Sequence, residues 1–89
     1  MATIWKFTLP MRDEFTIEMP RGARLLCVQT QGNQPCVWAL VNEEAEMETR
    51  RFAMRGTGHD ASGLTAEADY VGTFQLHGGT LVFHLFVRL

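Results

Sequence analysis

Apolar residues in this 89-residue chain recur at every second position, in short blocks separated by glycine, proline, asparagine and aspartate. A period of two places successive side chains on opposite faces of a β-strand, whereas an amphipathic helix repeats about every 3.6 residues. The pattern predicts strands at residues 3–9, 15–19, 24–30, 36–42, 50–55, 70–77 and 80–88. We therefore expect an all-β fold, a small antiparallel sandwich or partly closed barrel of six or seven strands that forms a single domain over residues 1–89.

Two glycine-containing turns predict how four of these strands pair. Gly78-Gly79 is typical of a two-residue hairpin, and Gly32-Asn33 suits a second one. With Gly78-Gly79 as the turn, Thr73 faces His84, and the hairpin acquires two distinct faces. The face expected in the core carries Tyr70, Phe74, Leu76, Leu81, Phe83, Leu85 and Val87. The opposite face is mixed and carries Thr73, Gln75, His77, Thr80, Val82 and His84.

Cys27 and Cys36 are too few for a disulfide scaffold or for a zinc site made of cysteine alone. With Gly32-Asn33 as the turn, Cys27 opposes Trp38 and Cys36 opposes Gln29. The two cysteines are then diagonal, with their Cα atoms about 7–8 Å apart, too far for an unstrained disulfide. A turn at Gln31-Gly32 would instead place them directly opposite. We expect two reduced thiols.

Two segments depart from the strand pattern. Residues 42–49 are predicted to form one or two helical turns, because Asn42 can cap a helix and glutamates cluster behind it. Residues 56–69 are rich in glycine and lack periodicity, so they are expected to form a long loop. Loops of this length often carry function.

The overall charge argues against several partners. Eight Lys and Arg residues against ten Asp and Glu give a formal charge of -2, which provides no general attraction to nucleic acid or to an anionic membrane. The N-terminal residues lack the basic and apolar regions of a secretion signal, and no apolar run approaches ~18 residues. We expect a cytoplasmic protein with no membrane association and no nucleic-acid partner. An acidic block at residues 43–48 precedes a basic block at 50–55, so any recognition of an anion must be local.

The residues best suited to binding lie in the basic block and on the mixed face of the last hairpin. Arg51 and Arg55 share one face of a predicted strand that runs into the turn Gly56-Thr57-Gly58-His59, which could hold a phosphate or a carboxylate. Alternatively, the arginines pair with the preceding glutamates. The candidate contact residues are Arg51, Arg55, Thr57, His59, Thr73, Gln75, His77 and His84.

Metal binding and catalysis have weaker support in the sequence. His77 and His84 are predicted to start about 13 Å apart at ~3.3 Å per residue, and no paired histidine or cysteine motif occurs, so we expect no metal and no cofactor. No serine, threonine or cysteine lies in a nucleophile motif, which argues against an enzyme. A small hydrolase with His59 or His84 as the base is the alternative.

A set of motifs also resembles a known family. The segments are Ile4-Trp5-Lys6-Phe7, residues 16–23, Trp38-Ala39-Leu40-Val41, Gly56-Thr57-Gly58-His59, residues 70–79 and residues 82–86. Together they resemble a family of small uncharacterised proteins from tailed phages, prophages and bacterial genomes, classed as a domain of unknown function. The resemblance implies no activity, but small phage accessory proteins often act by binding.

We therefore expect a non-enzymatic binding protein that inhibits or modulates a host complex or a host defence. The runner-up is also a binding function, a sponge for an anionic nucleotide signal. The alternatives of other classes are the small hydrolase and a structural component of a virion or of its assembly. The apolar C-terminal strand and the sheet edges of so small a domain favour a homo-oligomer. A host protein or a small anionic ligand is the expected further partner.

Overall fold

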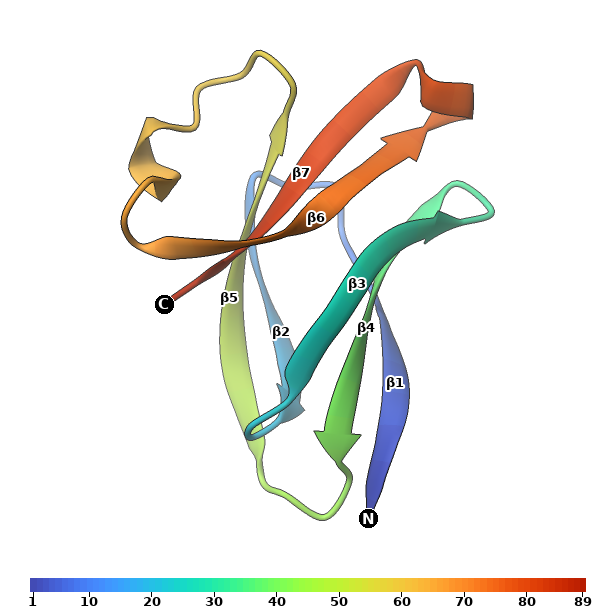
Figure 1. Cartoon of the computed structure of the whole chain (residues 1–89), viewed down its shortest axis with the longest axis vertical. Coiled ribbons are helices and arrows are strands. Elements are labelled where there is room, and N and C mark those ends of the chain that lie inside the picture. The colour runs from blue at the N-terminus through green and yellow to red at the C-terminus, as the bar shows by residue number, and fades with distance from the viewer.

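The computed structural model describes residues 1–89 as seven antiparallel strands in two sheets (Figure 1). The three-stranded sheet has the order β1-β4-β3 and comprises β1 (Ala2–Thr8), β4 (Gln34–Asn42) and β3 (Arg24–Gln31). The four-stranded sheet has the order β2-β5-β7-β6 and comprises β2 (Glu14–Pro20), β5 (Met47–Gly56), β7 (Leu81–Arg88) and β6 (Ala68–Leu76). The sheets do not close into a barrel, so the all-β prediction is confirmed in its sandwich form.

The core lies between the two sheets and is built from the alternating apolar residues of both. Phe52 and Leu85 from the four-stranded sheet and Val37 from the three-stranded sheet are completely buried. Each large apolar side chain removed from water contributes roughly 1.5–3 kcal/mol, so this shared layer is the main source of stability. The other buried members are Leu9, Phe15, Met19, Ala23, Val28, Ala39, Val41, Met54, Phe74, Leu76 and Val87.

The first predicted hairpin is confirmed in its register from the turn to Cys27, and a bulge at Leu26 shifts the pairing beyond that point. Gly32 and Asn33 have φ values of 56° and 67°, as a tight two-residue turn between β3 and β4 requires. Cys27 pairs with Trp38 and Gln29 pairs with Cys36. Both cysteines are free.

The second predicted hairpin is confirmed in its centre and wrong at its ends. Thr73 pairs with His84, but a bulge at Val71 shifts the register, so that Tyr70 pairs with Phe86. An extra residue in one strand inverts the faces beyond it. Tyr70, which was expected in the core, is therefore 56% exposed, while Val71 packs against the core. Leu81, also expected in the core, is 43% exposed because it lies at the end of its strand.

The predicted helix at residues 42–49 is wrong. Residues 43–46 form a turn in which Asn42 Oδ1 accepts a hydrogen bond of 3.1 Å from the Glu44 N–H. Met47 already belongs to β5, where it pairs with Pro20 of β2. The cap residue is thus used by a turn, and pairing with a distant strand outweighs the local helical tendency.

One margin of the sandwich is closed by β3 and β6, which lie side by side although they belong to different sheets (Figure 1). Gly72 permits this approach, because a Cβ atom at that position would lie 2.7 Å from Val28 Cγ1. Beyond the strand ends, the two hairpin turns meet through Asn33 and His77. The His77 N–H donates to Asn33 Oδ1 at 2.9 Å, and His77 Nδ1 lies 3.1 Å from Asn33 Nδ2.

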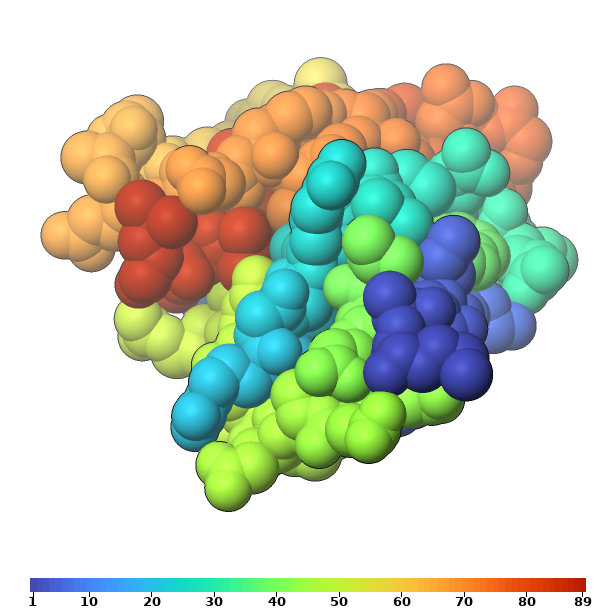
Figure 2. Space-filling view, turned by 60° about the horizontal axis from the view of Figure 1, so that its bottom comes forward, coloured from blue at the N-terminus to red at the C-terminus, as the bar shows by residue number.

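The predicted long loop is present between β5 and β6, and it packs onto the outer face of the four-stranded sheet. Its Leu64 is only 3% exposed, in a short 3-10 turn (Ser62–Leu64). Arg55 Nε donates to the Asp60 carbonyl at 3.1 Å, and the Leu89 N–H donates to the Glu67 carbonyl at 3.0 Å. Figure 2 shows β1, β3 and the turn after β4 on a side of the molecule that this loop does not reach.

None of the helical turns has the length and hydropathy that a membrane span requires.

Candidate functional site

The outer face of the four-stranded sheet brings together four of the predicted contact residues. Arg55 of β5 pairs with His84 of β7, which pairs with Thr73 of β6, so their side chains lie in one row across the sheet. Thr57 follows β5 directly, and its N–H donates to the Val82 carbonyl at 3.1 Å. Alternation along each strand points these side chains away from the core.

A chain of hydrogen bonds runs through this row and fixes the His84 ring. His84 Nδ1 lies 2.9 Å from Thr73 Oγ1, and His84 Nε2 lies 2.8 Å from Thr57 Oγ1. Tyr70 extends the chain through its hydroxyl, which contacts the Thr73 hydroxyl. Each threonine hydroxyl can donate or accept, so the pair can accommodate either neutral tautomer or the charged ring.

The contact between Thr57 and His84 has the elements of a nucleophile and a base. In activated nucleophiles the base is oriented by a third group, usually a carboxylate that fixes its tautomer. Here the third group is the Thr73 hydroxyl, which imposes no single tautomer. The two threonine hydroxyls therefore hold the His84 ring in place, but they do not fix the tautomer that a catalytic base needs.

Arg55 is fully occupied by contacts within the chain. Its guanidinium donates to the carbonyls of Asp13, Met54 and Asp60 at 2.8–3.1 Å, and to Glu14 Oε2 at 2.8 Å. These bonds hold the segment before β2 and the loop after β5 on the same face of the sheet. Arg55 thus acts as a structural anchor in this structure.

The turn Gly56-Thr57-Gly58-His59 is also satisfied internally. The His59 N–H donates to the Gly56 carbonyl at 3.0 Å, and Gly58 has a φ of 88° that few other residues adopt. The His59 ring lies so close to Gly56 that a Cβ atom there would be 2.9 Å from it. Thr57 and His59 line one wall of a shallow pocket of ≈ 210 Å³ opposite residues 80–83.

Three predicted contact residues lie apart from this row. His77 sits in the hairpin turn and is held by Asn33. Gln75 lines a shallow surface pocket with Thr73 and with Gln29 and Thr30 of β3. Arg51 lies further along β5 and makes no ion pair or side-chain hydrogen bond. The arginine–glutamate pairing considered from sequence forms at Arg50, which lies 3.6 Å from Glu48.

Two residues that the sequence did not single out, Glu14 and Arg88, complete the charged part of this face. Arg88 donates to both Glu14 oxygens at 2.8 Å, and Arg55 adds a third bond to Oε2. The hydrogen bonds from Arg88, supported by Arg55 and opposed by partial burial, lower the pKa of Glu14 to about 2. Extending the alternation of the last strand by one step, from Phe86 to Arg88, would have placed this arginine on the same face.

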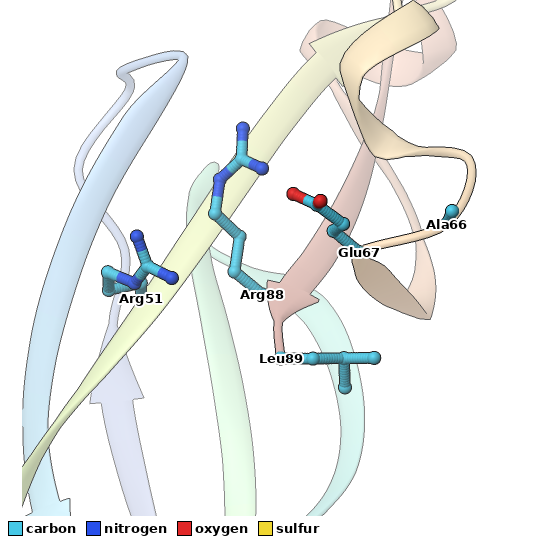
Figure 3. A pocket seen from close by; sticks show the side chains of 5 residues that line it. All are labelled: Arg51, Ala66, Glu67, Arg88 and Leu89. Carbon is cyan, nitrogen blue, oxygen red and sulfur yellow. The ribbon is translucent and has the colours of Figure 1, made fainter.

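Arg51 and Arg88 lie together at a surface pocket. Both arginines line a pocket whose remaining wall is formed by Ala66, Glu67 and Leu89 (Figure 3). Side chains from β5, β7 and the end of the loop therefore converge at one place on the surface. No group of three or more His, Cys, Asp or Glu side chains is placed to hold a metal ion.

Comparison with known proteins gives a family match. The model of a family described as Domain of unknown function (DUF7352) matches residues 1–89. No curated protein matches the chain, and no solved structure matches it.

Proposed function

The chain belongs to the DUF7352 family of unknown function, and we propose that it is a non-enzymatic binding protein that docks onto an acidic host protein. The proposal is carried by the outer face of the three-stranded sheet, which the β5–β6 loop leaves open.

This outer face is apolar across all three strands. Ile4 and Leu26 are 57% and 42% exposed, and the half-buried side chains of Cys27, Trp38 and Leu40 lie between them. Ile4 pairs with Leu40, Trp38 pairs with Cys27, and Leu26 is the exposed bulge residue directly before Cys27, so the five residues form one surface. We call it the apolar outer face. Scattered apolar residues are ordinary on a protein surface, but a contiguous group typically marks an interface.

Charge indicates what kind of partner this face fits. Strands β1, β3 and β4 contain no Asp or Glu, and their charged residues are Lys6 and Arg24. The acidic turn at residues 43–46 follows β4, but its Glu44 pairs with the N-terminus at 3.0 Å and its Glu46 pairs with Arg21 at 3.5 Å. The whole chain, in contrast, has a formal charge of -2. Complementarity therefore favours a partner with acidic side chains around an apolar centre.

The context of the partner comes from the resemblance to small proteins of phages and prophages. We propose that the chain has this origin, that it acts in the cytoplasm of a bacterial host, and that docking inhibits or modulates a host complex or a host defence. Trp38 at the centre of the apolar outer face supports this, since aromatic residues dominate the binding energy of many protein interfaces.

Self-association has a separate structural basis in β1, which is an edge strand of the three-stranded sheet. An unpaired edge can add a further strand, and β1 carries only one charged residue, Lys6, to oppose this. We propose that two copies pair β1 with β1 around a two-fold axis. Their apolar outer faces would then join on one side of a continuous sheet.

The docking proposal is tested by capture from a bacterial lysate, with Leu26→Glu as the variant and Met11→Glu as its matched control. Both positions are exposed, and both substitutions add one negative charge, but Met11 lies in the turn between β1 and β2. The wild type and Met11→Glu should retain the same acidic protein, and Leu26→Glu should lose it. Binding of the purified partner should also weaken with salt.

Retention by Leu26→Glu equal to that of the wild type would contradict the proposal, as would a partner that is basic at neutral pH.

The self-association proposal is tested independently by sedimentation velocity at micromolar concentration. A dimer in the wild type that is lost in Ile4→Pro supports pairing through β1, because proline removes a backbone hydrogen-bond donor from this strand. A monomer at every concentration contradicts it.

A further inference from the structure

Arg51 and Arg88 form the walls of two adjoining pockets on the outer face of the four-stranded sheet. The first, of ≈ 240 Å³, is completed by Ala66, Glu67 and Leu89 (Figure 3). The second, of ≈ 260 Å³, lies on the side of β2 and is completed by Glu14, Phe15, Thr16 and Phe52. Both arginines therefore face the space of both pockets.

The two guanidinium groups differ in what holds them. Arg88 is fixed by its two hydrogen bonds to Glu14, and its side chain is only 20% exposed. Arg51 is exposed and has neither an ion-pair nor a hydrogen-bond partner in the chain. One arginine is therefore held in place before any ligand arrives, and the other is free to close on it.

The charges around the pockets are not balanced. Arg51, Arg55 and Arg88 project from neighbouring strands of one face. Glu14 pairs with Arg55 and Arg88, and Glu67 lines the first pocket without pairing, so three arginines face two carboxylate side chains. Like charges on adjacent strands repel each other, so an anion between Arg51 and Arg88 would relieve the repulsion.

From this geometry we propose that the Arg51–Arg88 pocket binds the phosphate group of a small molecule. Guanidinium groups bind phosphate oxygens through pairs of parallel hydrogen bonds. Glu14 occupies the Nε–H and one Nη2–H of Arg88, which leaves the Nη1 and the second Nη2 hydrogens of Arg88 for a phosphate. The pockets fall below the ~300–1,000 Å³ of sites that enclose a whole drug-sized ligand, so they fit a phosphate group with the remainder of the ligand exposed. This site is independent of the apolar outer face.

Glu67 sets a limit on the charge that the site accepts. Its carboxylate points toward the Arg88 guanidinium in Figure 3, without reaching ion-pair distance, and it lines the same pocket. A bound phosphate would lie close to this negative charge. Neutralising Glu67 should therefore strengthen binding, whereas removing Arg51 should weaken it, which gives the test two variants with opposite expected signs.

The test is a titration of the purified full chain with inorganic phosphate at constant ionic strength, followed by the arginine Nε–Hε resonances in NMR. The wild type should show saturable shifts at Arg51 and Arg88. Arg51→Gln should weaken binding about tenfold or more, because it removes charge-assisted hydrogen bonds. Glu67→Gln should tighten it severalfold. Arg24→Gln, which removes an exposed arginine from the other sheet, is the matched control and should bind as the wild type does.

Arg51 is the informative position because it makes no bond that folding needs, whereas replacing Arg88 would also break its pair with Glu14. Parallel titrations with a nucleoside 5′-monophosphate and a single-stranded oligonucleotide distinguish the sources of phosphate. Saturable binding of inorganic phosphate or the monophosphate that depends on Arg51 supports the proposal. Unsaturable shifts, equal affinity in Arg51→Gln, weaker binding in Glu67→Gln, or binding of the oligonucleotide alone would each overturn it.

Discussion

Gly72 shows how one residue can determine whether two sheets meet. It lies in β6 against Val28 of β3, where an added Cβ atom would be 2.7 Å from Val28 Cγ1. We predict that Gly72→Ala lowers the free energy of unfolding by about 1–3 kcal/mol, the usual cost of overpacking. Urea denaturation measures this. Gly63→Ala, where a Cβ atom meets nothing within 4 Å, is the control and should change stability little; equal effects would contradict the prediction.

Glu14 makes the stability of the domain depend on pH. Its pKa falls from an ordinary 4.5 to about 2 in the folded state, through the hydrogen bonds from Arg88 and then Arg55. A lowered folded-state pKa stabilises the fold above the unfolded pKa, and this stabilisation is lost as the pH falls from 4.5 toward 2. The carboxylate is half exposed, so we expect a contribution of only about 1 kcal/mol.

The measurement is urea denaturation of the wild type and Glu14→Gln at several pH values. The variant should be the less stable protein at pH 7, and the difference should shrink as the pH falls below about 4.5. A difference between the two proteins that stays constant from pH 7 to pH 2.5 would rule out Glu14 as the source of this dependence.

At the scale of elements, the two hairpin turns are linked by Asn33 and His77, whose φ values of 67° and 52° are the only positive ones outside glycine. We predict that Asn33→Gly keeps the β3–β4 turn, since glycine accepts a positive φ, but loses both hydrogen bonds to His77. The loss should cost about 0.5–1.5 kcal/mol. Amide hydrogen exchange should become faster at His77 and stay unchanged at Leu85 in the core. Unchanged exchange at His77 would show that the link does not order the turn.

The sequence predicted those elements whose structure is local. The turns Gly32-Asn33 and Gly78-Gly79 require positive φ values, and each fixes the register of the strands beside it, so the pairs of Cys27 with Trp38 and Thr73 with His84 followed. The bulge at Val71 was not predictable, because the alternation of Tyr70, Gly72, Phe74 and Leu76 continues through it in the sequence.

Non-local pairing explains the remaining differences. The segment 42–49 has helical caps and charges, yet Met47 pairs with Pro20 of a strand distant in sequence. Alternation assigned Arg51 and Arg55 to the correct face of β5. The ion-pair partner of Arg55, however, is Glu14 of β2, a strand that is distant in the sequence. Which charges neutralise each other therefore depends on the order β2-β5-β7-β6, which no local pattern encodes.

For the molecule as a whole, the β5–β6 loop is part of the packed structure. Leu64 anchors it at 3% exposure. We predict that Leu64→Ala lowers the free energy of unfolding by about 2–3 kcal/mol and makes residues 57–67 more susceptible to limited proteolysis. Leu81→Ala, at a position that is 43% exposed, is the control and should leave the cleavage pattern unchanged. Equal protease resistance of Leu64→Ala and the wild type would show that the loop holds without this anchor.

The strands of the three-stranded sheet differ in charge from the rest of the molecule. The three strands β1, β3 and β4 carry two positive charges and no negative one, so the rest of the chain carries a net charge of four negatives. We expect the electric field of an acidic partner to orient the three-stranded sheet of this protein toward the partner before the two make contact. Its association rate should therefore fall as ionic strength rises, even though protein and partner are both anionic overall.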